Sequence, residues 1–395
     1  MSDVTIRRMT DQEVQHVFSP LTSYAFHPSP PFRDEEDWEA LIHRRKNAVY
    51  LGAFEGDQGV AAAVNSPMTQ HVRWAILGAG AVWGVTTAPE ARRKGTCRRL
   101  MAQILARDRE EGRPVSCLYP FRASFYERLG YVSFPLAYNA VFQPAPLVPL
   151  LKQDLGGTVE RMLVGEGYDA YRAYTKRMQA RTHGMAVFLP GEKEQVQKEN
   201  RSWLALARVD GEVVGVMLYA LTGDEITRFT LRAYRFYYDT SQARYLLLQW
   251  IARHVDQASQ VKLWLPPFER PATWMDDLQI SLEAPARGAM GRVADISGLD
   301  GIEIGAGAFT ARVSDPLCPW NGTVWRFETV DGQLRVSPAA RAECHLTIQA
   351  LTALVYGTND PGDFEVRGWG DPSPQLQTTM RTMFARRLPY LHEAF

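Results

Sequence analysis

The segment from Gly78 to Gly112 changes its hydrophobic period partway along, and this change limits the possible folds more than any other feature. Apolar residues run almost continuously up to Thr87, as in a buried strand, and after Pro89 they recur every three or four positions. The positions that share one helical face are Cys97, Leu100, Met101, Ile104 and Leu105. The segment therefore predicts a strand followed by an amphipathic helix, the unit of a layered structure of helices and sheets.

The rest of the chain repeats this arrangement once and then changes. Two successive parts each predict a helix, three strands, a second helix and a last strand, with hairpin turns at Gly56 and Gly211. A third part begins near Arg292 and predicts short strands followed by two helices. With 395 residues and about 150 residues per typical domain, we expect an α+β protein whose domains span residues 1–150, 151–288 and 289–395.

The beginning of the chain predicts less regular structure. Residues 19–32 contain four prolines, which favour an irregular loop over a helix or a central strand. A helix is expected from Asp34 to Arg45, because acidic residues favour its N-terminus and apolar residues recur at helical spacing.

Composition and charge exclude several classes of protein. Lys and Arg together number 44, as do Asp and Glu, so the chain lacks the overall positive field that nucleic-acid or anionic-membrane binding ordinarily uses. The N-terminus has no apolar signal core and no apolar run approaches the roughly 20 residues of a membrane span, which predicts a cytoplasmic protein. The four cysteines are widely spaced and no HExxH motif occurs, so no disulfide framework and no metal site are expected.

A basic loop with a single glycine connects the predicted strand to the predicted helix. It reads Arg92-Arg93-Lys94-Gly95-Thr96-Cys97. A helix N-terminus presents unpaired N–H groups and a partial positive charge, and with the basic side chains it favours a pyrophosphate, which the backbone at Gly95 can approach closely. The alternative is that these basic residues are only the solvated start of a helix. The aromatic element Ser124–Tyr131, about 30 residues later, favours an anion-binding loop instead.

The loop and the aromatic element resemble motif A (Q/R-x-x-G-x-G/A) and the FYxxxGF-like element of the GNAT family of acetyl-CoA-dependent N-acetyltransferases. Cys97 departs from the motif, because it replaces Gly or Ala with another small residue. The resemblance implies that acetyl-CoA is bound by Val85, Thr86, Thr87, Arg92, Arg93, Lys94, Gly95, Thr96, Cys97 and Arg98. Phe121 is added to this set, although related proteins often have a small polar residue at its position.

Over nearly its whole length the chain is similar to the Eis (enhanced intracellular survival) acetyltransferases. The resemblance implies two tandem GNAT-like domains, each a mixed central sheet flanked by helices, of which the first is catalytic and the second degenerate. A sterol-carrier-like α+β domain follows. It also implies acetylation of amines, at several sites on aminoglycosides in the best-known members, and assembly as hexamers. Family roles carried over by motif make Tyr126 the general acid and the terminal carboxylate of Phe395, which reaches the active site, the general base.

The chemistry of acetyl transfer requires both roles. At pH 7 only about one alkylamine in a thousand is unprotonated, so a base must remove a proton before the amine attacks a thioester. The leaving thiolate needs a proton or a hydrogen bond, which a phenol can supply. Without the resemblance, Tyr126 is an ordinary core tyrosine and Phe395 a solvated terminus, although the apolar ending from Leu388 favours docking of the tail.

Aromatic and acidic residues alternate near the N-terminus and suggest an amine-binding surface. Cations are recognised by aromatic faces and carboxylates together. The candidates are Tyr24, Phe26, Asp34, Trp38 and, beside the C-terminus, Glu393. Helix-capping acids and core aromatics would explain the same residues.

Three functions fit these observations. The first is an acetyl-CoA-dependent N-acetyltransferase with a broad range of amine acceptors and direct attack in a ternary complex. The second is a binding protein that holds CoA and an apolar ligand without turnover. The third is a protein N-acyltransferase that transfers long acyl chains. The second GNAT-like half shows no basic glycine turn, which predicts that it has lost cofactor binding.

Overall fold

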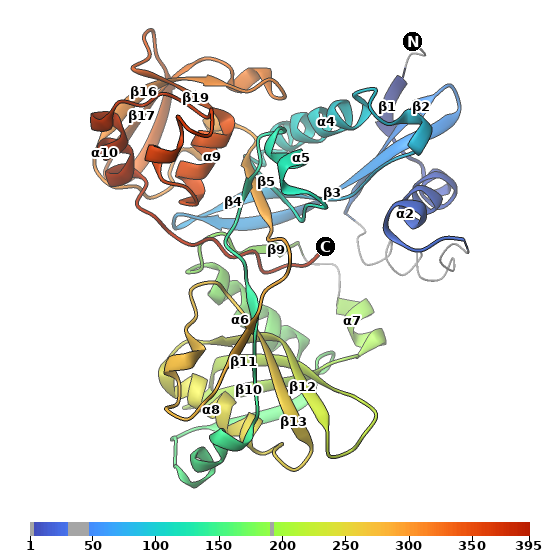
Figure 1. Cartoon of the computed structure of the whole chain (residues 1–395), viewed down its shortest axis with the longest axis vertical. Helices are drawn as coiled ribbons and strands as arrows, with labels where there is room; N and C mark the ends of the chain where they lie inside the picture. The colour runs from blue at the N-terminus through green and yellow to red at the C-terminus, as the bar shows by residue number, and fades with distance from the viewer. Residues whose placement is uncertain (1–3, 31–46, 190–192) are drawn as a thin grey trace. The chain divides into compact units, whose positions relative to one another are not determined.

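A computed structural model describes residues 4–30, 47–189 and 193–395 of the chain (Figure 1). It divides into two compact units, one within residues 1–135, 180–191 and 287–395, and the other within residues 136–179 and 192–286. Each unit is built from segments that are distant in sequence. The domain boundaries expected from the sequence remain predictions.

A sheet with the strand order β1-β2-β3-β4-β5-β15-β6 forms the centre of the first unit, and β9 pairs with β3. The first four strands form an antiparallel meander, and β4 then pairs with β5 in parallel. The strands are β1 (Val4–Arg8), β2 (Val49–Glu55), β3 (Gln58–Val72), β4 (Ala75–Thr87), β5 (Val115–Leu118), β6 (Val132–Ser133), β9 (Ala186–Phe188) and β15 (Met290–Val293).

Helices cover both faces of this sheet. The helix α4 (Thr96–Glu110) packs its apolar side against residues 51, 53, 61 and 63, which point to one face. The π-helix η1 (Val14–Phe18), which continues from α1 (Asp11–Glu13), and the helix α2 (Ser19–Phe26) pack against residues 50, 54, 62 and 64 on the other face. This alternation follows the two-residue period of a strand. The short α5 (Ala123–Glu127) follows β5.

A second, four-stranded sheet belongs to the same unit, in the order β18-β17-β16-β19. Its helices α9 and α10 share one hydrophobic core with β15 and the end of the β3–β4 hairpin. The elements are β16 (Ala308–Ser314), β17 (Val324–Val330), β18 (Gln333–Pro338), β19 (Cys344–Thr347), α9 (Ile348–Tyr356) and α10 (Pro374–Met383). After α10 the tail runs back to end beside β9 (Figure 1).

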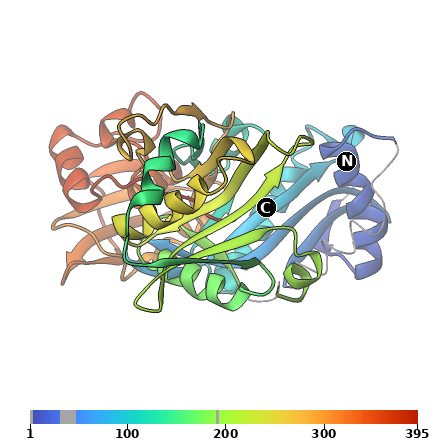
Figure 2. The ribbon, with the colours of Figure 1, turned by 90° about the horizontal axis from the view of Figure 1, so that it is seen from below.

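The second unit contains a seven-stranded sheet in the order β14-β7-β13-β12-β11-β10-β8, with helices on both sides (Figure 2). Its strands are β7 (Tyr138–Phe142), β8 (Thr158–Leu163), β10 (Trp203–Val209), β11 (Glu212–Thr222), β12 (Phe229–Tyr238), β13 (Ala258–Leu265) and β14 (Ser281–Glu283). Its helices are α6 (Tyr168–Gln179), α7 (Lys193–Glu199) and α8 (Ser241–Ala252). From β8 onward the pairing is three antiparallel steps, one parallel step and two antiparallel steps, as in the first sheet from β1 onward.

The expected α+β class is confirmed, with two mixed sheets and a separate C-terminal sheet. The buried face of α4 is also confirmed, because Leu100, Met101, Ile104 and Leu105 are all inaccessible to solvent. The expectation of an irregular loop over residues 19–32 is wrong in its first part, where Ser19–Phe26 form α2. Pro20 is the second residue of α2, which continues from the π-helix η1 without a break, since the N–H of Ser19 donates to the carbonyl oxygen of Val14. The missing N–H of the proline therefore falls where the hydrogen-bond pattern changes from π to α. The helix expected from Asp34 to Arg45 lies outside the described residues.

Candidate active site

The strand β4 separates from β5 halfway along its length. The two strands pair only from Ala79 to Val82, and β4 then continues alone on that side to Thr87. Its register with β3 shifts at the same place, where Gly84 has a φ of +59° and a Cβ atom would lie 2.8 Å from the ring of Phe18. A bulge of this kind bends a strand away from its neighbour. It opens a cleft between the ends of β4 and β5.

The loop that follows β4 presents backbone donors to this cleft. Gly95 precedes α4 with a φ of +81°, Arg93 has a φ of +64°, and no atom lies within 4 Å of the position of a Cβ atom at Gly95. No side chain caps the first turn of α4. The helix therefore begins with free N–H groups and an open approach, which is a favourable environment for an anion.

The cleft has a volume of about 790 Å³. Of the residues expected to bind acetyl-CoA, all but one line it: Val85, Thr86, Thr87, Arg92, Arg93, Gly95, Thr96, Cys97, Arg98 and Phe121. The exception is Lys94, whose Nζ lies 3.4 Å from Oε1 of Glu55. Arg92 is held in place because its Nε donates to the carbonyl oxygen of Thr87 at 3.1 Å.

A smaller pocket of about 260 Å³ shares Phe26, Val85 and Phe121 with the cleft, so the two hollows adjoin. Tyr126 and Phe395 both line the smaller pocket, although they are 269 positions apart in the sequence. The remaining lining residues are Phe18, Thr22, His27, Val82, Trp83, Gly84 and Tyr119. The structure thus brings the two proposed catalytic residues together beside the cleft.

Burial raises the pKa of two side chains that line these hollows, Tyr126 in the smaller pocket and Cys97 in the cleft. Tyr126 is 4% exposed, and this burial, with a smaller contribution from the nearby Cys97, raises the pKa of its phenol well above the usual value. Burial also raises the pKa of the Cys97 thiol to about 11. Both groups are therefore protonated at neutral pH, so Tyr126 can donate a proton and Cys97 is a poor nucleophile.

The residues expected to bind the acceptor amine differ in where they lie. Phe26 lines both hollows, whereas Tyr24 is 56% exposed and lines neither. The carboxylate of Glu393 accepts a hydrogen bond from the backbone N–H of Phe188 at 3.3 Å. Asp34 and Trp38 lie outside the described residues.

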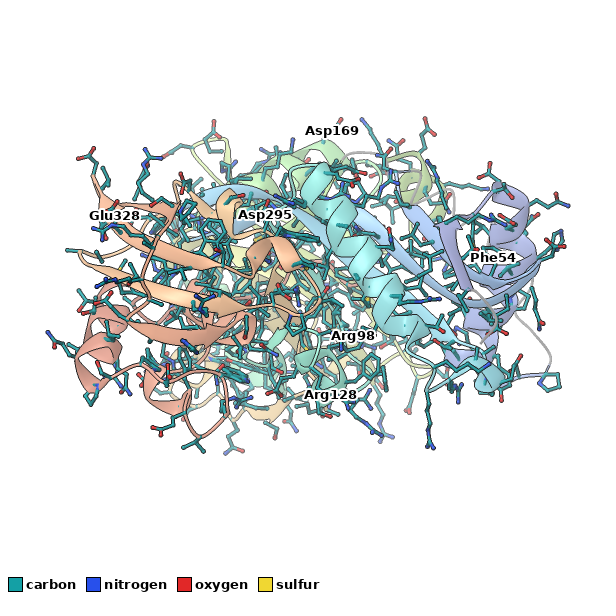
Figure 3. All side chains as sticks on the ribbon, turned by 90° about the horizontal axis from the view of Figure 1, so that it is seen from above. Phe54, Arg98, Arg128, Asp169, Asp295 and Glu328 are labelled. Atoms are coloured by element: carbon teal, nitrogen blue, oxygen red, sulfur yellow. The ribbon has the colours of Figure 1, made fainter. Side chains whose placement is uncertain are left out.

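Several lining residues were missed by the sequence analysis. Arg128 and Phe125 line the cleft, and the Arg128 guanidinium lies 5.9 Å from the centre of the Phe125 ring. Arg128 lies near Arg98 at one end of α4 (Figure 3). Phe125 and Arg128 belong to the aromatic element Ser124–Tyr131, so the spacing of that element could have indicated them. Trp83 and Tyr119 carry no such signal.

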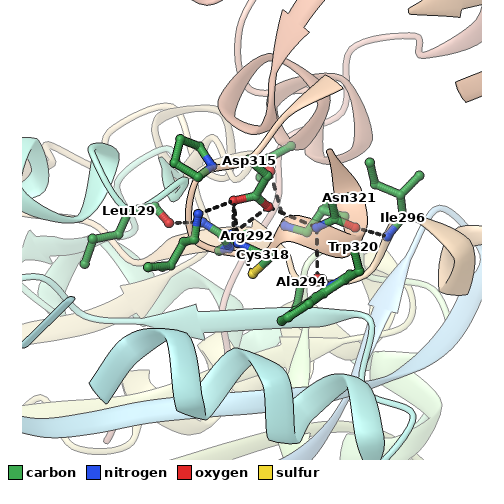
Figure 4. Close-up of polar contacts among 12 residues, drawn as sticks. Leu129, Arg292, Ala294, Ile296, Asp315, Cys318, Trp320 and Asn321 are labelled. Carbon is green, nitrogen blue, oxygen red and sulfur yellow. Dashed lines mark hydrogen bonds and ion pairs between the residues drawn. The ribbon is translucent and has the colours of Figure 1, made fainter. Parts of the chain in front are cut away.

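A buried polar network supports the turn that follows Tyr126 (Figure 4). Leu129 lines the cleft, and its carbonyl oxygen accepts a hydrogen bond from Arg292 of β15. Nη2 of Arg292 also donates to both carboxylate oxygens of Asp315, at 2.8 and 2.7 Å, and both side chains are fully buried. The C-terminal part of the chain therefore holds this turn in place.

The second unit has a different turn at the equivalent position. Between β12 and α8, Thr240 caps the helix by accepting a hydrogen bond from the N–H of Ala243 at 3.2 Å. The preceding residue is Asp239, whose carboxylate would repel an anion. A phosphate group is thus disfavoured at α8, in contrast to α4.

Comparisons with known families agree with this geometry. Residues 5–133 match the family of acetyltransferase (GNAT) domains, and residues 302–392 match the family of sterol carrier protein domains. No curated protein sequence matches the chain. No described helix is long and apolar enough to cross a membrane, and no cluster of three metal-ligand side chains occurs among the described residues.

Solved structures share the fold over the whole length. A GCN5-related N-acetyltransferase from Anabaena variabilis has a TM-score of 0.84 at 15% identity, with all of both chains covered. One from Kribbella flavida has a TM-score of 0.81 at 22% identity, covering all of this chain and 98% of the other. Eis1 from Mycobacterium abscessus has a TM-score of 0.76 at 16% identity, with all of both chains covered. The expected Eis-like GNAT architecture is confirmed at the level of the fold.

Proposed function

Because residues 5–133 form a GNAT acetyltransferase domain, we propose that this protein transfers an acetyl group from acetyl-CoA to the amine of a small molecule or peptide. The cleft volume of about 790 Å³ is in the range of pockets that hold a cosubstrate. The pyrophosphate would lie against the N-terminus of α4 and the loop from Arg92 to Gly95. The pantetheine arm would extend along the free side of β4, from Val85 to Thr87.

One observation carries the proposal. Tyr126 and the terminal residue Phe395 line the same pocket, and this pocket adjoins the cleft at Val85 and Phe121. A thioester that follows β4 out of the cleft would arrive between a phenol and a carboxylate. A carboxylate can serve as the base and a phenol as the proton donor of amine acetylation.

The proposed reaction is a direct attack in a ternary complex. The carboxylate of Phe395, directly or through a water molecule, takes a proton from the ammonium group of the acceptor. The free amine forms a C–N bond to the thioester carbonyl carbon, and the C–S bond of the tetrahedral intermediate then breaks. Tyr126, which is protonated at neutral pH, gives a proton to the leaving sulfur and takes one back, directly or through water, from the nitrogen of the new amide, so that one proton is released overall.

The acceptor range and the assembly belong to the same proposal. The aromatic lining of the smaller pocket supports binding of organic cations through ring faces. Aminoglycosides, polyamines and lysine-type amines, with acetylation at several sites, are the acceptors that the family resemblance implies. A homohexamer would follow from the same resemblance, and sedimentation analysis tests it.

The test measures release of the CoA thiol from acetyl-CoA by protein with a native C-terminus, across these three classes of amine. The proposal predicts amine-dependent release, with several equivalents consumed on an aminoglycoside. Tight binding of acetyl-CoA without amine-dependent release would contradict it and favour a binding protein, whereas faster transfer of long acyl chains would favour an acyltransferase.

Two variants test the catalytic groups. One additional glycine after Phe395 displaces the carboxylate and should lower kcat by about a hundredfold or more, while a tag at the N-terminus should not. Tyr126→Phe should lower kcat by a similar factor and leave the affinity for acetyl-CoA unchanged. Tyr131→Phe is the matched control, because it removes a buried phenol that bonds Ser116 and lines neither hollow. Full activity of the extended protein would contradict the role of the terminus.

A further inference from the structure

The last residues of the chain are tied down from two sides. The N–H of Tyr390 donates to the carbonyl oxygen of His183 at 2.9 Å. Three residues later, Oε1 of Glu393 accepts from the N–H of Phe188 in β9 at 3.3 Å, and the Glu393 carbonyl oxygen accepts from the hydroxyl of Tyr119 at 3.0 Å. Glu393 therefore bridges β9 and the segment after β5.

The terminal ring occupies the space between the same two elements. The ring of Phe395 meets that of Tyr119 edge to face, with centroids 5.5 Å apart, and meets that of Phe188 in the same way at 5.8 Å. Edge-to-face packing is a favourable arrangement for aromatic pairs. Tyr119 and Phe188 thus each contact the tail twice, once through a polar group and once through a ring.

These contacts oppose the usual behaviour of a chain terminus. Terminal residues fray unless they are tied down, and a displacement of about 1 Å at a reacting group can cost about a hundredfold in rate. A base attached to the last residue therefore needs fixed partners nearby. Within the described residues, the contacts of Glu393 are the closest polar ties to the terminus along the chain.

We propose that Glu393, Tyr119 and Phe188 form a C-terminal clamp that positions the Phe395 carboxylate in the smaller pocket. Glu393 is then a positioning residue, and not the acceptor-binding carboxylate expected from the sequence. This inference rests on the proposed role of the terminus as general base. The clamp itself is a structural statement that can be tested without measuring activity.

Substitutions of Glu393 distinguish positioning from charge recognition. Glu393→Gln keeps an oxygen that accepts from the N–H of Phe188 and removes the charge, whereas Glu393→Ala removes both. The clamp predicts that Glu393→Ala lowers kcat about tenfold or more, with KM for the amine within about twofold, and that Glu393→Gln keeps at least half of kcat. Glu365→Ala, at an exposed carboxylate, is the control. A Glu393→Gln variant as impaired as Glu393→Ala, with a raised KM for amines, would overturn the proposal.

Release of the terminal residue by carboxypeptidase Y reports the clamp directly. Mass spectrometry follows the loss of Phe395 from native protein, with denatured samples of each variant giving the intrinsic cleavage rate. Tyr119→Phe leaves the sequence near the terminus unchanged and removes only the hydroxyl that bonds Glu393. The clamp predicts release at least about fivefold faster in Tyr119→Phe and Glu393→Ala than in the wild type, with Glu393→Gln close to the wild type.

The two readouts separate the clamp from the proposed function. If the added glycine leaves kcat unchanged while the protease results hold, the terminus is not the base but the clamp stands as a structural device. If kcat falls with the added glycine but Tyr119→Phe and Glu393→Ala release Phe395 at the wild-type rate, the clamp is refuted and the catalytic proposal remains. Wild-type kcat in Glu393→Ala would also refute the positioning role.

Discussion

Arg292 and Asp315 form a buried ion pair, and we expect the loss of Asp315 to lower the free energy of unfolding more than the loss of Arg292. After Arg292→Met, Asp315 keeps three neutral donors: the N–H groups of Leu317 and Cys318 and the side-chain amide of Asn321. After Asp315→Asn, the guanidinium keeps as described partners the Leu129 carbonyl oxygen, the Cys318 sulfur and one amide oxygen at position 315, and none of these carries a compensating charge. The amide nitrogen that replaces one carboxylate oxygen also faces the donors Arg292 and Asn321.

Removing one partner of a buried ion pair costs about 3–5 kcal/mol, since the remaining charge loses its compensation. We expect Arg292→Met to lie near the lower end, at about 3 kcal/mol, because the carboxylate retains its donors. Asp315→Asn should lie near the upper end, at about 5 kcal/mol. The double variant leaves no isolated charge, so its cost should be about 3 kcal/mol smaller than the sum of the single costs.

Equilibrium unfolding in urea, followed by circular dichroism, measures these free energies in a double-mutant cycle. Asn321→Ser provides a control, because it weakens the network without isolating a charge. The reasoning would be refuted if the free-energy costs of the two single variants add up to that of the double variant. It would also be refuted if Arg292→Met costs more than Asp315→Asn.

Two further predictions concern the glycines of the cleft and the buried histidines. Gly84→Ala should destabilise the fold more than Gly95→Ala, because both have positive φ but only the former meets the ring of Phe18; equal shifts in thermal unfolding would contradict this. Gly95→Ala should instead weaken binding of acetyl-CoA, measured by calorimetry. Burial lowers the pKa of His71 to about 4 and of His183 to about 3. Unfolded histidine titrates near 6.5, so stability is present above that pH and is lost as the pH falls toward 4. His71→Phe should flatten this dependence, and an unchanged unfolding profile between pH 7 and 4.5 would argue against it.

Local patterns predicted the cleft well. The strand and the basic loop were recognised from residues 85–98, because hydrophobic period, helix charge and glycine conformation are properties of neighbouring residues. The same reasoning failed at Pro20, since this proline lies where the π-helix η1 passes into α2 and the helical hydrogen-bond pattern changes. Lys94 matched the motif by position, yet its side chain pairs with Glu55 of β2, outside the motif.

Contacts between segments that are distant in the sequence could not be predicted from local patterns. Nothing in residues 290–293 indicates that they form β15 between β5 and β6, because any strand of suitable period could occupy that position. The position of Glu393 beside the terminus suggested acceptor binding, whereas its contacts with Phe188 and Tyr119 depend on where β9 and the tail pack.

The sequence by itself determined the α+β class, the anion-binding loop before α4 and the aromatic element that contains Tyr126. These features depend on interactions within about a dozen residues, so periodicity and turn chemistry are sufficient to recognise them. Only the tertiary structure decided that Phe395 lies beside Tyr126 and that Arg292 holds the turn after it. Those contacts join residues more than 160 positions apart. They form because the packing of the whole unit buries apolar surface and gives buried polar groups their hydrogen-bond partners.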